Sequence, residues 1–163
     1  GLDAYCIETV PTLKEAKMAL DVWKSQPGSL GKDLWISFSC KSSNGGLFTN
    51  GGDRFRDVVF NLSSYSDLSA IGINCTIPSL ILDFVRSAYP FANGKPFVVY
   101  PNHGEPYVPE TGGFDYSVRT GFEHYLDAIP ELFKMNVRLF GGCCRVNMEH
   151  VRQIADAVKK LEQ

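Results

Sequence analysis

The sequence contains no long hydrophobic run. Its longest apolar stretches, such as Phe97–Tyr100 (FVVY), have the length of a β-strand and fall far short of the roughly 20 residues that a membrane-spanning helix needs. The sequence also has no secretory signal pattern, in which a charged segment precedes an apolar one, at its beginning. We therefore expect a protein of the cytoplasm that has no membrane partner.

Neither sign of charge dominates. The 163 residues include 16 Lys and Arg against 18 Asp and Glu, which gives a formal net charge of −2. A near-neutral chain lacks the basic surface with which proteins bind nucleic-acid phosphates, so we expect no nucleic-acid partner. With 44% hydrophobic and 21% charged residues, the composition is typical of a globular protein. The length predicts a single domain over residues 1–163.

Cysteines are few, and their number is odd. The five are Cys6, Cys40, Cys75, Cys143 and Cys144. An odd number without a secretory signal argues against a disulfide framework. A bridge between the adjacent Cys143 and Cys144 is unfavourable, because neighbouring Cα atoms lie about 3.8 Å apart and disulfides prefer about 4.4–6.8 Å. The adjacent thiols predict either a redox pair or shared coordination of a soft metal.

Short apolar runs alternate with amphipathic stretches. The runs are rich in β-branched and aromatic residues, which indicates buried strands, and they cover residues 4–9, 34–39, 70–74, 96–100 and 137–140. Each run is followed by helical spacing of apolar residues. We predict helices after a capping pair formed by Thr12 and Glu15, over 57–62, over 80–88, over 118–133 with a break near Pro130, and over 151–161.

Five strand–helix repeats with nearly continuous apolar strands predict an α/β fold with a parallel sheet. Two architectures fit: an open doubly wound sheet and part of a (β/α)8 barrel. The end of the first strand, residues 8–11 (ETVP), lacks the Gly-x-Gly-x-x-Gly motif of dinucleotide-binding open sheets. A complete barrel needs at least about 200 residues, so five units form an incomplete one. Residues 41–53 and 101–116 are expected to be irregular loops at strand ends.

Three cysteines follow the ends of strands. Cys75 comes after the third strand, and Cys143 and Cys144 come after the fifth, behind Gly141 and Gly142. We expect the glycines to let the backbone turn, so that the thiols converge. In a flat sheet these strand ends would lie about 9–10 Å apart, so convergence favours a barrel. Three thiolates with one open position predict a catalytic zinc site.

The other two cysteines receive no role in this site. Cys6 lies within the first strand and Cys40 just past the second, and both are assigned to packing. Cys75 taken alone could also be a small buried hydrophobe. Redox use of the adjacent thiols stays open as an alternative, and it predicts thiol–disulfide exchange that persists after metal removal.

Four short motifs form a recognisable set: IETVP at residues 7–11, GINCT at 72–76, YPNHGE at 100–105 and GGCCR at 141–145. Together they resemble the homocysteine S-methyltransferase family, in the family's order and over essentially the whole chain. The resemblance implies a zinc-dependent (β/α)8 barrel that moves a methyl group from a sulfonium or ammonium donor to homocysteine, giving methionine. The five units here would correspond to the fourth to eighth of that barrel.

The resemblance also implies roles for individual residues. It makes Cys75, Cys143 and Cys144 the zinc ligands. It matches Glu8 to the acidic residue that contacts the homocysteine amino group, and Asn74 to a substrate-site residue beside the first ligand. The surroundings of Glu8 and Asn74 are more similar to the branch that uses S-methylmethionine or S-adenosylmethionine than to the betaine branch.

The sequence departs from the family at two points. His103 stands where the family has a small residue, and the family's N-terminal glycine-rich block is absent. The expected partners are homocysteine, a sulfonium methyl donor, and an N-terminal segment or a second copy that completes the barrel. The alternative is a catalytically silent half-barrel that retains a three-cysteine zinc site.

Overall fold

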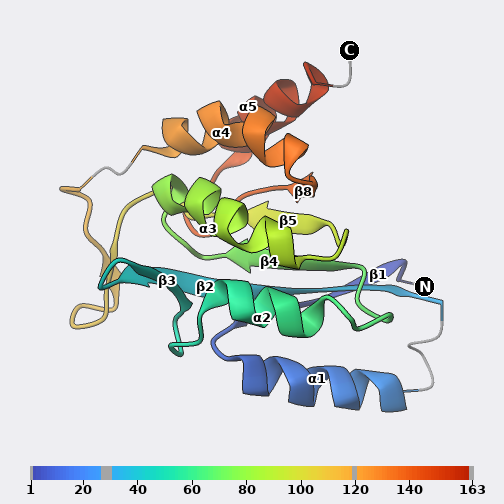
Figure 1. Cartoon of the computed structure of the whole chain (residues 1–163). Helices are drawn as coiled ribbons and strands as arrows, with labels where there is room; N and C mark the ends of the chain where they lie inside the picture. The colour runs from blue at the N-terminus through green and yellow to red at the C-terminus, as the bar shows by residue number, and fades with distance from the viewer. Residues whose placement is uncertain (1, 27–30, 119–120, 162–163) are drawn as a thin grey trace.

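A parallel β-sheet forms the centre of the protein (Figure 1). The structure, a computed structural model, describes residues 2–26, 31–118 and 121–161. The strand order is β1-β2-β4-β5-β8, and these strands span Ala4–Val10, Asp33–Ser43, Ala70–Asn74, Phe97–Tyr100 and Val137–Phe140. All five predicted strands are present and every neighbouring pair among them is parallel, which confirms the α/β prediction.

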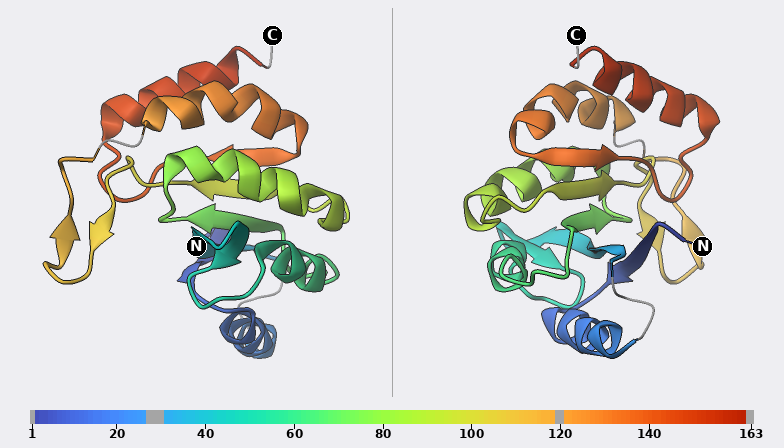
Figure 2. Two further views of the ribbon diagram at one scale, coloured as in Figure 1. Left: turned by 60° about the vertical axis from the view of Figure 1, so that its left-hand side comes forward. Right: turned by 90° about the vertical axis from the view of Figure 1, so that its right-hand side faces the viewer.

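The helices lie along one face of this sheet (Figure 2). They are α1 (Leu13–Ser25), α2 (Phe55–Leu62), α3 (Ile81–Ala88), α4 (Phe122–Lys134) and α5 (Met148–Lys159), with short 3-10 helices at Pro78–Leu80 and Tyr89–Phe91. Alternate strand residues, among them Ile36 and Phe38 of β2 and Ile73 of β4, point into the layer between sheet and helices and are fully buried. No helix in the described part of the chain is long and apolar enough to cross a membrane.

The opposite face of the sheet is left uncovered. Leu139 of β8 is 42% exposed there, and the side chain of Cys6 on β1 is also exposed. Helices on one face only distinguish a segment of a (β/α)8 barrel from a doubly wound sheet, in which helices cover both faces. Within the described ranges, β1 pairs only with β2 and β8 only with β5, so the barrel is incomplete.

Both segments predicted as irregular loops contain a β-hairpin, so that prediction is wrong. Strand β2 continues to Ser43 and pairs antiparallel with β3 (Gly46–Thr49). Strand β6 (Tyr107–Val108) pairs antiparallel with β7 (Gly113–Phe114) in the hairpin that projects from the body in Figure 2. These strands are short, with four residues in β3 and two each in β6 and β7. They are held by backbone hydrogen bonds and contain too few residues for the alternating pattern that marks a strand in the sequence.

Helix α4 runs without a break through Pro130, contrary to the predicted interruption. Pro130 lies on the exposed side, and the buried side, with Tyr125, Ile129 and Leu132, packs against the rest of the protein. This packing outweighs the hydrogen bond that a proline removes from a helix. The helix begins at Phe122, and residues 119–120 of the predicted range lie outside the described residues.

The sequence predicted the cap at the start of α1 but not the one at the start of α5. Thr12 caps α1 as expected, its side chain accepting a hydrogen bond from the Glu15 backbone N–H at 3.2 Å. Helix α5 begins with a reciprocal capping box between Asn147 and His150 that was not predicted, because histidine is not the usual partner. The apolar stripe predicted there is only partly buried, since Val151 is 49% exposed.

Candidate metal and substrate site

The carboxyl ends of three neighbouring strands lie at one level. Asn74, the last residue of β4, pairs with Tyr100, the last residue of β5. Val99 of β5 pairs in turn with Phe140 at the end of β8. Because these strands are parallel and in register, the segments that follow them leave the sheet at the same edge. Cys75 is the first residue after β4, and the loop with the two adjacent cysteines follows β8.

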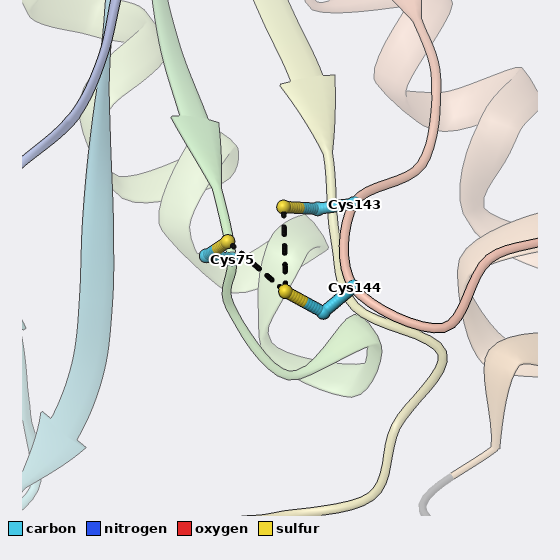
Figure 3. Close-up of side chains that lie close together, drawn as sticks. All are labelled: Cys75, Cys143 and Cys144. Carbon is cyan, nitrogen blue, oxygen red and sulfur yellow. Dashed lines mark hydrogen bonds between the residues drawn. The ribbon is translucent and has the colours of Figure 1, made fainter.

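The thiols of Cys75, Cys143 and Cys144 meet at this edge (Figure 3). The Cys144 Sγ lies 3.8 Å from the Cys75 Sγ and 3.9 Å from the Cys143 Sγ, and all three sulfurs lie within 4.8 Å of one another. Two thiolates bound to one tetrahedral zinc at about 2.3 Å lie about 3.8 Å apart. The spacing therefore fits zinc, and no other group of three His, Cys, Asp or Glu in the described residues is arranged to hold a metal.

The turn before Cys143 needs glycine because a Cβ would not fit there, and not because the backbone adopts a conformation reserved for glycine. Neither Gly141 nor Gly142 has a positive φ, so the expected reason for these glycines is wrong. A Cβ on Gly142 would lie 2.1 Å from Cγ1 of Val146, and one on Gly141 would lie 3.4 Å from Cβ of Tyr100. Gly142 is required because the loop folds back onto its own Val146 side chain.

Unusual backbone conformations gather around the site. Apart from glycine and asparagine, the described residues with positive φ are Thr9, Cys75 and Arg145, at 61°, 46° and 66°. Thr9 follows Glu8, and Arg145 follows the last cysteine of the group. Such conformations are unfavourable for residues with a Cβ, most of all for a β-branched one, and persist where neighbours hold them. No sequence pattern marked these positions.

Asn74 holds the first of these residues in place. Its side chain is buried, and its Oδ1 accepts hydrogen bonds from the Thr9 backbone N–H at 3.0 Å and from the Ser37 hydroxyl at 2.9 Å. Its Nδ2 donates to Oγ1 of Thr9 at 2.7 Å. These bonds tie the end of β1, where Glu8 lies, to the end of β4, where the first cysteine begins the loop.

The three thiols differ in acidity. A hydrogen bond from Cys75 lowers the pKa of Cys143 to about 6, so Cys143 is mainly a thiolate at neutral pH. The same interaction, together with burial, raises the pKa of Cys75. Burial and the neighbouring Cys143 charge raise the pKa of Cys144. One thiolate and two thiols therefore share the site when no metal is bound.

A cavity of about 290 Å³ opens on the uncovered face of the sheet, next to the glycine turn that precedes Cys143. Its lining combines apolar and polar groups from four strands and the glycine turn: Cys6, Glu8, Trp35, Val98, Tyr100, Leu139, Phe140, Gly141 and Gly142. The side chain of Glu8 is exposed, and no hydrogen bond or ion pair to its carboxylate is found within the described residues. The cavity thus offers one free anionic group next to the turn that carries Cys143.

Cys6 does not pack in the core, contrary to the assignment from the sequence. Its side chain is exposed in the cavity, and its Sγ lies 3.4 Å from the hydroxyl of Tyr100, which in turn lies 2.5 Å from the Ser37 hydroxyl. The alternation of β1 puts Cys6 on the same face as Glu8. Cys40 is buried as expected, at 7% exposure.

The geometry agrees with the comparison to known protein families. The family model described as Homocysteine S-methyltransferase matches residues 1–158. The chain belongs to the homocysteine S-methyltransferase family. This result confirms the resemblance that the four sequence motifs suggested.

Individual members of the homocysteine S-methyltransferase family give the extent of the match. Homocysteine S-methyltransferase YbgG of Bacillus subtilis is 35% identical over 99% of this chain and 49% of its own length. Homocysteine S-methyltransferase 4 of Zea mays is 32% identical over 99% of this chain and 46% of its own length. The metallated form of the homocysteine methyltransferase MmuM from Escherichia coli superposes with a TM-score of 0.72 at 25% identity, over 96% of this chain and 45% of that chain. The chain spans about half the length of the relatives it matches.

Proposed function

We propose that the protein transfers a methyl group from a sulfonium donor, S-methylmethionine or S-adenosylmethionine, to the sulfur of homocysteine, giving methionine. The observation that carries the proposal is the convergence of three thiols beside a cavity that contains an unpaired carboxylate. Membership of the homocysteine S-methyltransferase family supports the same reaction class.

Zinc is the proposed cofactor, held by Cys75, Cys143 and Cys144. The sulfur spacing of 3.8 and 3.9 Å supports this assignment, because it is the spacing of thiolates around a tetrahedral zinc. The exposure of Cys144 leaves room for a fourth ligand from solution. Bound zinc would supply a Lewis acid that lowers the pKa of the homocysteine thiol.

Glu8 is the proposed site for the amino group of homocysteine. Its carboxylate lines the cavity, has no partner among the described residues, and lies on the strand end that Asn74 fastens beside Cys75. An ammonium bound there would be held by a charge-assisted hydrogen bond. Asn74 is proposed to belong to the same substrate site, because its buried side chain fixes Thr9 next to Glu8.

The choice of a sulfonium donor rests on the sequence around Glu8 and Asn74, which resembles that branch of the family. Attack of a thiolate on a sulfonium methyl neutralises charge, so the site needs to align two sulfur atoms rather than stabilise a new anion. We also propose the cytoplasm as the location. The five cysteines are all free, and free thiols fit a reducing compartment.

The proposed reaction also needs the remainder of a barrel. The chain spans about half the length of its relatives, and β1 and β8 each have one neighbouring strand within the described ranges. These two facts support further β/α units, from an N-terminal segment or a second copy, that pair with the open edges. They also favour a second candidate function, a catalytically silent half-barrel that binds zinc.

A methionine-formation assay separates the two candidates. The zinc-loaded protein is sized by exclusion chromatography and given homocysteine with S-methylmethionine or S-adenosylmethionine. Methionine formation supports the transferase, and bound zinc without turnover supports the silent half-barrel. For the substrate site, Glu8→Gln should keep zinc and weaken homocysteine binding by about 10- to 100-fold, the value of a charge-assisted hydrogen bond. Asp21→Asn on the exposed side of α1 is the control, and unchanged homocysteine affinity in Glu8→Gln would return Glu8 to a structural role.

A further inference from the structure

The segment after β5 contributes no thiol, yet it bonds to both loops that do. The Cys143 backbone N–H donates to the carbonyl of Pro101 at 2.7 Å, and the His103 N–H donates to the carbonyl of Cys144 at 3.0 Å. On its other side, the Asn102 N–H donates to the carbonyl of Thr76 at 3.0 Å. Residues 101–103, which follow β5, therefore connect the loop after β4 to the loop after β8 through backbone hydrogen bonds.

A buried carboxylate completes this bridge. Glu105 is 7% exposed, and its two oxygens lie 3.0 and 3.1 Å from Nδ1 of His103. The same carboxylate forms an ion pair with Nε of Arg145 at 3.3 Å. Burial alone would raise the pKa of Glu105, but its own backbone N–H together with His103 and Arg145 lowers it, so the group is charged at neutral pH.

Arg145 is the partner that connects Glu105 to the thiols. It follows Cys144 directly and has a left-handed backbone, with φ at 66°, which a residue with a Cβ keeps only where its surroundings impose it. Its side chain is fastened at two points, by the Glu105 ion pair and by the ring of Tyr116, whose centroid lies 4.4 Å from the guanidinium carbon. The held side chain of Arg145 thus fixes the direction in which the backbone leaves Cys144.

We propose that Glu105 is a positioning residue of the metal site: it holds the loop with Cys143 and Cys144 at the distance from Cys75 that one metal ion requires. The inference rests on the proposed zinc site. Glu105 touches no sulfur, and acts through His103 on one side and Arg145 on the other. Both partners belong to loops at the carboxyl edge of the sheet and not to the hydrophobic core. Loss of the carboxylate should therefore disturb metal binding more than folding.

The test uses Co²⁺ and Zn²⁺ as probes of the purified protein. Glu105→Gln keeps the shape of the side chain but removes the charge that pairs with Arg145 and leaves one acceptor oxygen in place of two. We expect this variant to bind Zn²⁺ about 10- to 100-fold more weakly in competition with a chelator, as is common for residues that support metal ligands. Its Co²⁺ complex should lose intensity in the absorption bands typical of tetrahedral thiolate coordination. Glu110→Gln, an exposed carboxylate of the same segment, should match the unaltered protein.

Each result decides the proposal. Zn²⁺ affinity and Co²⁺ spectra equal to those of the unaltered protein in Glu105→Gln would overturn it. Should Glu105→Gln fail to fold, Arg145→Gln replaces it at an exposed position, and an unchanged affinity there would likewise overturn the role of the ion pair. If the unaltered protein itself binds neither ion, both the proposed zinc site and the positioning role fail. If the unaltered protein binds the ions and Glu105→Gln binds them equally well, only the positioning role fails.

Discussion

The Sγ atoms of Cys75 and Cys144 lie 3.8 Å apart, although the two cysteines are 69 positions apart in the sequence. Strand β5 lies between the strands that lead to them, and two strand spacings amount to about 9–10 Å. The loop after β8 closes this distance by bending back toward β4 over the end of β5, where the Cys143 backbone bonds to Pro101. Figure 3 shows the resulting convergence of the three thiols.

Replacement of single cysteines should separate the thiols that bind metal from the one that only lines the cavity. Cys75→Ser and Cys143→Ser are each expected to weaken zinc binding by at least about 100-fold, because each removes one of three thiolates. Cys6→Ser should retain zinc, since Cys6 bonds to Tyr100 instead. Metal analysis after dialysis against a weak chelator measures the difference.

The buried Cys40 provides a second control for this comparison. Cys40→Ala should lower the free energy of unfolding by about 1 kcal/mol through lost packing while leaving the zinc content unchanged. Full zinc retention in Cys75→Ser or Cys143→Ser would remove the proposed ligand set.

Zinc affinity should fall as pH falls, and the slope should depend on the pH range. Metal-bound cysteines carry no protons, so every proton held by the free site opposes binding. At pH 7 to 8 Cys143 is already a thiolate, because its pKa is lowered to about 6, whereas the raised pKa values of Cys75 and Cys144 keep those thiols protonated. Binding should therefore release about two protons there, rising toward about three below pH 6.

Titration calorimetry in buffers of different ionisation enthalpy counts these protons. The count should be unaffected by Cys6→Ser. Release of about three protons at pH 7.5 would mean that Cys143 is an ordinary thiol in the free site, against the hydrogen bond from Cys75.

Gly142→Ala should damage the metal site through crowding. The new methyl group would lie 2.1 Å from Cγ1 of Val146, so the loop must shift, and overpacking of this kind typically costs about 1–3 kcal/mol. If the loop shift accounts for the whole cost, zinc affinity falls by about 10- to 100-fold. Competition with a chelator measures this fall, and a thermal melt follows folding.

Gly113→Ala is the matched control for Gly142→Ala. The nearest side-chain atom to its new methyl group, Oγ1 of Thr111, is 3.8 Å away, which is ordinary contact, so zinc affinity should not change. Equal zinc affinities in the two variants would show that the loop accommodates a Cβ at position 142.

Much of the fold followed from the sequence. The apolar runs located every strand of the parallel sheet, because a strand buried against helices must be apolar whatever its neighbours are. Helical periodicity located the helices in the same way. The ends were less predictable: α4 continues through Pro130, and the hairpin strands β3, β6 and β7 have only two to four residues, too few to show a strand pattern in the sequence.

The sequence by itself determined which residues stand at the ends of the strands, and so which cysteines the sheet could bring together. Only the tertiary structure decided how they meet, which residues take left-handed backbone conformations, and where a carboxylate is buried. Cys6 and Cys40 illustrate the difference: each is a cysteine on or beside an apolar strand, yet one is exposed in a cavity and the other is buried. Glu105 lies in the YPNHGE motif, but the sequence predicts no role for it, because its burial and its ion pair with Arg145 depend on a loop from another strand. Local pattern fixes the type and the approximate position of an element, whereas its exact ends, its burial and its pairing depend on what the rest of the chain brings against it.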